Sequence, residues 1–264
     1  AAPSLPAAPS DVATRFVGRG AEMDRLLQLL GLARQGGGMV LSITGEAGAG
    51  KSRLCAEFAA RCRAQGVAVH RVRAAAHGQV VPMAPVLELL RAACFGLDHA
   101  ASAPAARRAV EAVLARIGRL EPANVELFGE LLGLAEGDAD ARPSAHARPA
   151  RLQALVEALV RDPQAPCRVL IVEDLHWLDR PSQVLLNVIA AAVAGTRTLL
   201  VCNSRTSPPP EWVPLAHSTH LSLGALSAAQ LRELLAPWSR KAADRSARLP
   251  DGAIDRLIER SHGN

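Results

Sequence analysis

The sequence predicts an α/β fold, a three-layer sandwich in which helices cover both faces of a mainly parallel five-stranded sheet. Short apolar runs alternate with longer segments of helical periodicity, which is the order of strand–helix–strand units. One run, Val169-Leu170-Ile171-Val172, is apolar throughout, as expected of a central strand buried on both faces of a parallel sheet. With 264 residues, the chain can bury a sizeable core.

The composition excludes several classes of partner. Hydrophobic residues make up 49% of the chain and charged residues 21%, as in soluble globular proteins. The chain has no tyrosine, and its net charge of +5 comes from scattered arginines, so we expect no direct contact with nucleic acid. No apolar run approaches the roughly 18 residues that cross a bilayer, and the five cysteines form no C-x-x-C pair. We therefore expect a cytoplasmic protein that does not contact a membrane.

The first segments lead into a strand. Residues 1–14 are rich in proline, alanine and serine and are predicted to be a linker. An amphipathic helix is expected from residue 21 to about residue 35, and three glycines at 36–38 end it. The apolar run at 39–44 is then the first strand of the core.

Residues 45–52, with the sequence G-E-A-G-A-G-K-S, match the P-loop or Walker A pattern G-x-x-x-x-G-K-[ST]. They lie between a predicted strand and a predicted helix, as the pattern requires. Glycines let successive backbone N–H groups face an anion, and the helix N-terminus reinforces that site. Lys51 would reach the β- and γ-phosphates, and the Ser52 hydroxyl would complete the shell of a Mg²⁺ ion. The alternative is a glycine-rich turn without a ligand.

A helical insertion is predicted between the second and third strands. A helix over 51–65 and a strand over 67–72 follow the P-loop. Proline and glycine then separate segments rich in Ala, Leu and Arg with helical spacing, at 84–94, 104–118, 124–134 and 148–161. The insertion therefore covers about residues 84–161.

The third strand, 168–173, ends in two adjacent acids, Glu173 and Asp174. Two carboxylates at the end of a buried strand are costly unless a cation meets them. A Mg²⁺ ion that bridges the β- and γ-phosphates is the natural partner, and one acid can also orient the attacking water. By itself, an apolar run that ends in two acids is as typical of a turn at the end of a strand as of a metal site. Downstream of a P-loop, it indicates a Walker B element.

Arg205 follows the fourth predicted strand, at the edge of the sheet where the P-loop is expected. A helix is expected over 181–194 and a fourth strand over 198–202, followed by Asn203, Ser204 and Arg205. Because ligands of open α/β sheets lie at the carboxyl ends of strands, Asn203 and Arg205 would lie beside the phosphates, where Arg205 could sense the γ-phosphate. The alternative is a surface arginine.

The last part of the chain predicts a fifth strand at 220–223 and then helices. Ser227 would cap a helix to about residue 235, and a final amphipathic helix would cover 251–261. We expect an NTPase core over 15–224 and the truncated start of a C-terminal helical lid over 225–264.

These features together resemble the ATPase domain of the STAND class, signal-transduction ATPases related to AAA proteins. The subgroup occurs in large bacterial regulators, some fused to LuxR-type DNA-binding domains and others to class III adenylyl or guanylyl cyclases. The resemblance rests on F-V-G-R at 16–19, the P-loop, E-D-L-H-W-L-D at 173–179, Arg205, and G-N at 263–264. It implies the strand order 5-1-4-3-2.

The resemblance also implies roles for single residues. Val17 and Arg19 would lie near the adenine and Lys51 on the phosphates, and Ser52 with Glu173 would hold Mg²⁺. Asp174 would orient water, although the Glu-Asp order leaves open which acid binds the metal, so the metal set is Ser52, Glu173 and Asp174. The catalytic set is Asp174, Lys51 and Arg205. The residues expected to contact the nucleotide are Val17, Arg19, Gly45, Glu46, Ala47, Gly48, Ala49, Gly50, Lys51, Ser52 and Arg53.

The expected function is a regulatory switch that binds ATP or ADP with Mg²⁺ and hydrolyses ATP slowly, inside a larger bacterial signalling protein. Its partners would be flanking domains and, on ATP binding, further copies of itself. Two alternatives remain open: a P-loop kinase that acts on a small acceptor, and an assembly module with negligible hydrolysis.

Overall fold

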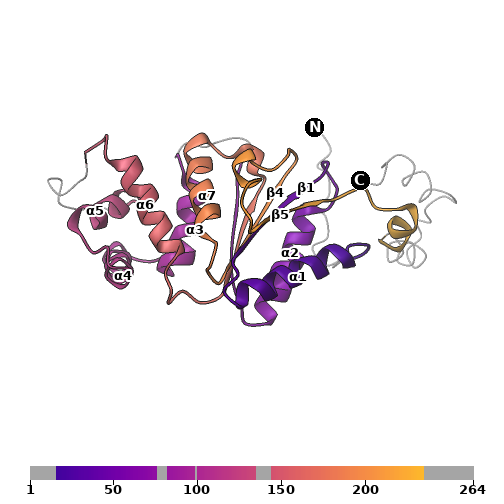
Figure 1. Ribbon diagram of the computed structural model, residues 1–264, viewed down its shortest axis with the longest axis horizontal. Helices are drawn as coiled ribbons and strands as arrows, with labels where there is room; N and C mark the ends of the chain where they lie inside the picture. The colour runs from indigo at the N-terminus through magenta and orange to yellow at the C-terminus, as the bar shows by residue number, and fades with distance from the viewer. Residues whose placement is uncertain (1–15, 76–81, 99, 135–143, 235–264) are drawn as a thin grey trace, which may run out of the picture.

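A computed structural model describes residues 16–75, 82–98, 100–134 and 144–234 (Figure 1). Its centre is a parallel sheet of five strands, β1 (Met39–Thr44), β2 (Ala68–Arg73), β3 (Arg168–Glu173), β4 (Thr198–Ser204) and β5 (Ser218–Ser222). They lie in the order β2-β3-β4-β1-β5. This is the predicted order 5-1-4-3-2 counted from the other edge, so the fold prediction is confirmed.

Helices cover both faces of the sheet because the central strands are apolar on both faces. Side chains alternate along β3, so Val169 and Ile171 pack against α1 (Gly20–Arg34) and α2 (Lys51–Ala64). Leu170 and Val172 face the opposite core, against α3 (Ala84–Phe95), α6 (Arg148–Val160) and α7 (Arg180–Ala192). Figure 1 shows α1 and α2 on one side of the strands, with α3 and α7 on the other.

The insertion lies between β2 and β3, as predicted. After α3 come α4 (Ala103–Arg116) and α5 (Pro122–Leu131), and α6 returns the chain to the sheet. The insertion shares one core with the α3–α6–α7 face, and the rings of Phe95 and Phe128 meet edge to face with centroids 5.1 Å apart. In Figure 1, α4 and α5 lie at the end of the molecule away from β1 and β5.

The ends of two strands differ from the prediction. The fourth strand continues through Asn203 and Ser204, because these residues stay in register with Ile43 and Thr44 of β1. The fifth strand begins at Ser218, two residues early, because Ser218 and Thr219 already pair with β1. Both strand ends consist of polar residues that pair with β1, and a prediction based on apolar runs does not include polar residues.

The predicted linker over 1–14 and the predicted last helix over 251–261 lie outside the described residues. A helix does begin at Ala228, directly after Ser227. Among the described residues, no helix combines the length and the apolar character that a membrane span needs.

Candidate nucleotide site

The glycine-rich loop joins β1 to α2. Gly48 and Gly50 adopt φ angles of +83° and +89°, which residues with a side chain rarely adopt. A Cβ atom on Gly45 would lie 2.6 Å from the carbonyl oxygen of Leu223, so the close approach of the chain after β5 also requires glycine there. The loop therefore has the backbone that the motif predicts, and α2 begins at Lys51 with its N-terminus toward the loop.

Lys51 is buried and bends back over the loop. Its Nζ donates hydrogen bonds to the carbonyl oxygens of Gly45 (2.7 Å) and Glu46 (2.8 Å). Burial and then the charge of Arg205 lower the pKa of Lys51, while Asp174 and Glu46 oppose that shift. The ammonium group thus lies inside the loop, where phosphate oxygens are expected.

A cavity of about 350 Å³ opens beside this loop. It brings the P-loop together with Asp174 from the end of β3 and Arg205 from the end of β4, as the sequence predicts. One acid and several cations face it, which suits a polyanionic ligand such as a nucleoside triphosphate. Its lining residues are Ala47, Gly48, Gly50, Lys51, Ser52, Arg53, Arg73, Asp174 and Arg205.

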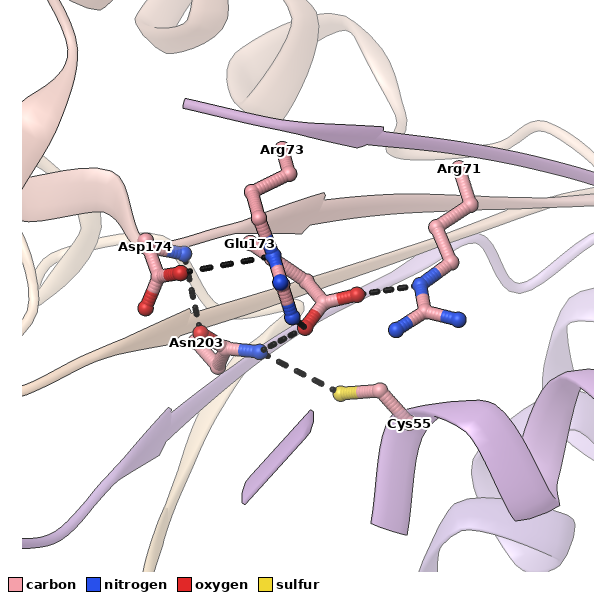
Figure 2. Close-up of polar contacts among 6 residues, drawn as sticks. All are labelled: Cys55, Arg71, Arg73, Glu173, Asp174 and Asn203. Atoms are coloured by element: carbon pink, nitrogen blue, oxygen red, sulfur yellow. Dashed lines mark hydrogen bonds and ion pairs between the residues drawn. The ribbon is translucent and has the colours of Figure 1, made fainter. Parts of the chain in front are cut away.

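Glu173 lies behind the cavity, with its side chain fully buried and clamped by two arginines of β2 (Figure 2). Arg71 Nε donates to Glu173 Oε1. Arg73 Nη2 donates to Oε2 at 3.1 Å, and Asn203 Nδ2 approaches the same oxygen at 3.3 Å. Burial raises the pKa of Glu173, but hydrogen bonds from Arg71, Ser52 and Arg73 outweigh it, so the pKa is lower than usual.

Asp174 follows in a left-handed conformation, with φ of +59°. Its backbone N–H donates to Asn203 Oδ1 at 2.9 Å, and Arg73 Nε lies 3.5 Å from its Oδ2 (Figure 2). Asn203 is therefore fully buried between the two acids and does not line the cavity. Asn203 also reaches Cys55 Sγ of α2 at 3.6 Å, so one amide joins β4, the acids and the P-loop helix.

The residues present fit a magnesium ion. The Ser52 hydroxyl and the carboxylates of Glu173 and Asp174 are hard oxygen ligands of the kind that Mg²⁺ prefers, and Ser52 hydrogen-bonds Glu173. Within the described ranges, no group of three His, Cys, Asp or Glu side chains could hold a metal ion. A nucleotide phosphate would have to complete the coordination, as is usual for Mg²⁺.

Arg19 and Val17 are buried outside this cavity. Arg19 Nη2 donates to the carbonyl oxygens of Ala49 (2.9 Å) and Gly224 (2.5 Å), and Nη1 donates to Glu22 at 2.9 Å. Arg19 thus ties the P-loop to the chain that leaves β5. The contact of Val17 and Arg19 with adenine stays a prediction.

Two further residues of the E-D-L-H-W-L-D run have distinct positions. Asp179 caps α7, since its Oδ1 accepts from the backbone N–H of Ser182 at 2.6 Å, while its Oδ2 accepts from the N–H of Met83 at 3.1 Å. His176 packs on Trp177 with ring centroids 5.1 Å apart. Both of its ring nitrogens are buried without a hydrogen bond, and burial lowers its pKa.

Sequence reasoning missed Arg71, Arg73 and the role of Asn203. The register of β2 and β3 brings Arg73 directly opposite Glu173. The signal available in the sequence was a strand with arginines at alternate positions next to a strand that ends in acids.

Comparison with known proteins shows which family the chain belongs to. The AAA ATPase domain family matches residues 15–201. An uncharacterized protein, R02095 of Rhizobium meliloti (strain 1021), is 35% identical over 242 residues. The alignment covers 89% of this chain but only 23% of that protein, so the chain spans about a quarter of the length of this curated relative.

Two solved structures are distant relatives in shape. One is a STAND protein with a tetratricopeptide repeat sensor from Pyrococcus horikoshii, 15% identical, with a TM-score of 0.44, covering 94% of this chain and 28% of that one. The other is Drosophila ORC bound to DNA, also 15% identical, with a TM-score of 0.46, covering 87% of this chain and 47% of that one. Likenesses this distant add nothing about function.

Proposed function

Because the chain belongs to the AAA ATPase domain family, we propose that it is a regulatory ATP switch. It binds ADP, and ATP with Mg²⁺, and hydrolyses ATP slowly, as one module of a larger bacterial signalling protein of the STAND class. The observation that carries the proposal is the convergence of Lys51, Ser52, Asp174 and Arg205 on one cavity beside the P-loop.

The residues of this cavity divide the work. Lys51 leaves the carbonyl oxygens of its own loop for the β- and γ-phosphates. Ser52 and the strand-end acids would hold Mg²⁺, whose charge would offset the negative charge on the phosphate oxygens. Arg205 contacts the γ-phosphate, and Asp174 orients the water that attacks it.

The buried guanidinium of Arg19 supports a switch rather than a metabolic enzyme. It hydrogen-bonds the P-loop at Ala49 and the chain at Gly224, so a shift of the loop on hydrolysis would reach whatever follows β5. The parent would be a transcription regulator or a nucleotide cyclase, and ATP would favour assembly of several copies.

The test compares wild type with Lys51→Ala, Asp174→Ala and a control, Arg161→Ala, which removes an exposed cation that pairs with Glu157 and does not line the cavity. Binding of a fluorescent ADP or ATP analogue and release of phosphate are measured. Lys51→Ala should weaken binding by about 100-fold, since it removes a charge-assisted contact to phosphate. Asp174→Ala should bind ATP yet lose turnover, and Arg161→Ala should behave like wild type. Binding that is absent, or insensitive to Lys51, would refute the proposal.

The same samples separate the alternatives. A kinase would transfer the γ-phosphoryl group to an added small acceptor faster than to water. A pure assembly module would form oligomers with a non-hydrolysable ATP analogue, show no turnover, and be unaffected by Asp174→Ala.

A further inference from the structure

Arg73 contacts both strand-end acids (Figure 2) and also lines the nucleotide cavity. It is the last residue of β2, opposite Glu173 in the register. Its Nη2 contacts Glu173 Oε2 at 3.1 Å, and its Nε lies 3.5 Å from Asp174 Oδ2. One guanidinium group therefore bridges both acids that the site offers to a metal ion.

Arg71 has a different position, although it also pairs with Glu173. It contacts the other oxygen, Oε1, and does not line the cavity. A fully buried carboxylate needs a lasting cationic partner, and Arg71 supplies one from outside the cavity lining. Arg73 is 56% exposed, so its contacts are weaker and can be exchanged for another cation.

One of the two acids that Arg73 contacts lines the cavity. Asp174 is the acid that lines the cavity, and Ser52, the third residue of the predicted metal set, lines it too. A guanidinium and a divalent ion within a few ångströms of the same carboxylates repel each other, so the acids hold one or the other.

We propose that Arg73 substitutes for Mg²⁺ when the site holds a nucleoside diphosphate. This inference rests on the proposed nucleotide binding. The cations that line the cavity, Lys51, Arg73 and Arg205 among them, neutralise the diphosphate without a metal. A triphosphate adds γ-phosphate oxygens as metal ligands, so Mg²⁺ would then take the place of Arg73 at the two carboxylates. Mg²⁺ is needed for the triphosphate and dispensable for the diphosphate.

The experiment measures the affinity of the whole chain for ADP in excess Mg²⁺ and in EDTA. In wild type, removal of Mg²⁺ should change the ADP affinity by less than about threefold. In Arg73→Gln, ADP should bind at least about tenfold more weakly in EDTA and recover in Mg²⁺. Arg71→Lys is the matched control, because it keeps a charge on Glu173 Oε1 and should stay independent of Mg²⁺.

A second readout follows the metal itself. Electron paramagnetic resonance of Mn²⁺ in the presence of ADP should show tighter metal binding to Arg73→Gln than to wild type, because the competing cation is gone. Wild-type ADP binding that collapses in EDTA would overturn the inference and leave the proposed function intact, even if Arg73→Gln does not fold. Absence of ADP binding in both buffers would refute the proposed function, and this inference with it.

Discussion

Glu173 carries a buried negative charge that Arg71 and Arg73 pair with. Its contribution to the free energy of unfolding depends on pH. Its pKa in the folded state is lower than usual, so the ionised form stabilises the fold above the unfolded-state pKa of about 4.3. That contribution is lost as the pH falls through the folded-state pKa. Acid should therefore weaken the clamp formed by Arg71, Arg73 and Asn203.

We expect Glu173→Gln to lower the free energy of unfolding at pH 7 by about 1–3 kcal/mol and to flatten its dependence on pH below about 5. Urea unfolding between pH 3 and pH 7 measures both effects. The control is Glu121→Gln, which breaks an exposed ion pair with Arg151 and should cost less than about 0.5 kcal/mol. An acid slope in Glu173→Gln equal to that of wild type would contradict the expectation.

The residues of the site were predictable where a motif or a strand end fixes them. Lys51 and Ser52 follow from the P-loop spacing, and Asp174 and Arg205 follow because parallel strands end at one edge of the sheet. Arg71 and Arg73 were not predictable, because their partner depends on the register of β2 against β3. Arg19 contacts Gly224, 205 residues away, and no local pattern indicates such a contact.

At the scale of elements, Arg168 fastens the helical insertion to the sheet. It is the first residue of β3 and only 2% exposed. Its guanidinium donates to the carbonyl oxygens of Ala93 (3.0 Å) in α3 and Val160 (3.2 Å) in α6, and to Thr198 Oγ1 (3.2 Å) in β4. One side chain thus binds the last turns of two helices, where carbonyl groups lack helical partners.

Arg168→Met should fill similar space yet leave those carbonyl groups without donors, at a cost of about 2–4 kcal/mol in the free energy of unfolding. Chemical denaturation followed by circular dichroism measures the change. Arg197→Met is a suitable control, since exposed Arg197 makes a similar bond to Ala165 O and should cost under about 1 kcal/mol. Equal costs for the two variants would show that Arg168 has no special role.

The elements of the insertion were predicted within a few residues, because Pro85, Pro104 and Pro122 each lie in a first helical turn, where proline is favoured. The sequence did not predict the end of β4, because that end depends on contacts with residues distant in the sequence. Asn203 is polar and fully buried, and only its partners, Glu173 and the N–H of Asp174, explain why it belongs in a strand.

At the scale of the molecule, the family assignment agrees with the AAA-like resemblance seen in the sequence, and the candidate site joins distant parts of the fold. A ligand that binds the folded state and not the unfolded state should therefore stabilise the whole domain. With ADP at 100 times its dissociation constant, the gain is about 2.7 kcal/mol, which corresponds to a rise in Tm of roughly 5–10 °C for a domain of this size.

Differential scanning fluorimetry of wild type and Lys51→Ala, with and without ADP, measures this rise. At the same ADP concentration a 100-fold weaker affinity leaves a gain of only about 0.4 kcal/mol, so the Tm of the variant should rise by about 1 °C. A shift of equal size in both proteins would mean that ADP binds elsewhere.

The strand order has a consequence for synthesis on the ribosome. β1, which carries the P-loop, pairs only with β4 and β5 among the described strands, and both are translated more than 150 residues later. At 5–20 residues per second, β1 waits about 10–30 s for its first sheet neighbour. During that time an apolar strand with two open edges is exposed to other nascent chains. The order that places β1 between β4 and β5 thus makes the strand of the P-loop one of the last to find its neighbours.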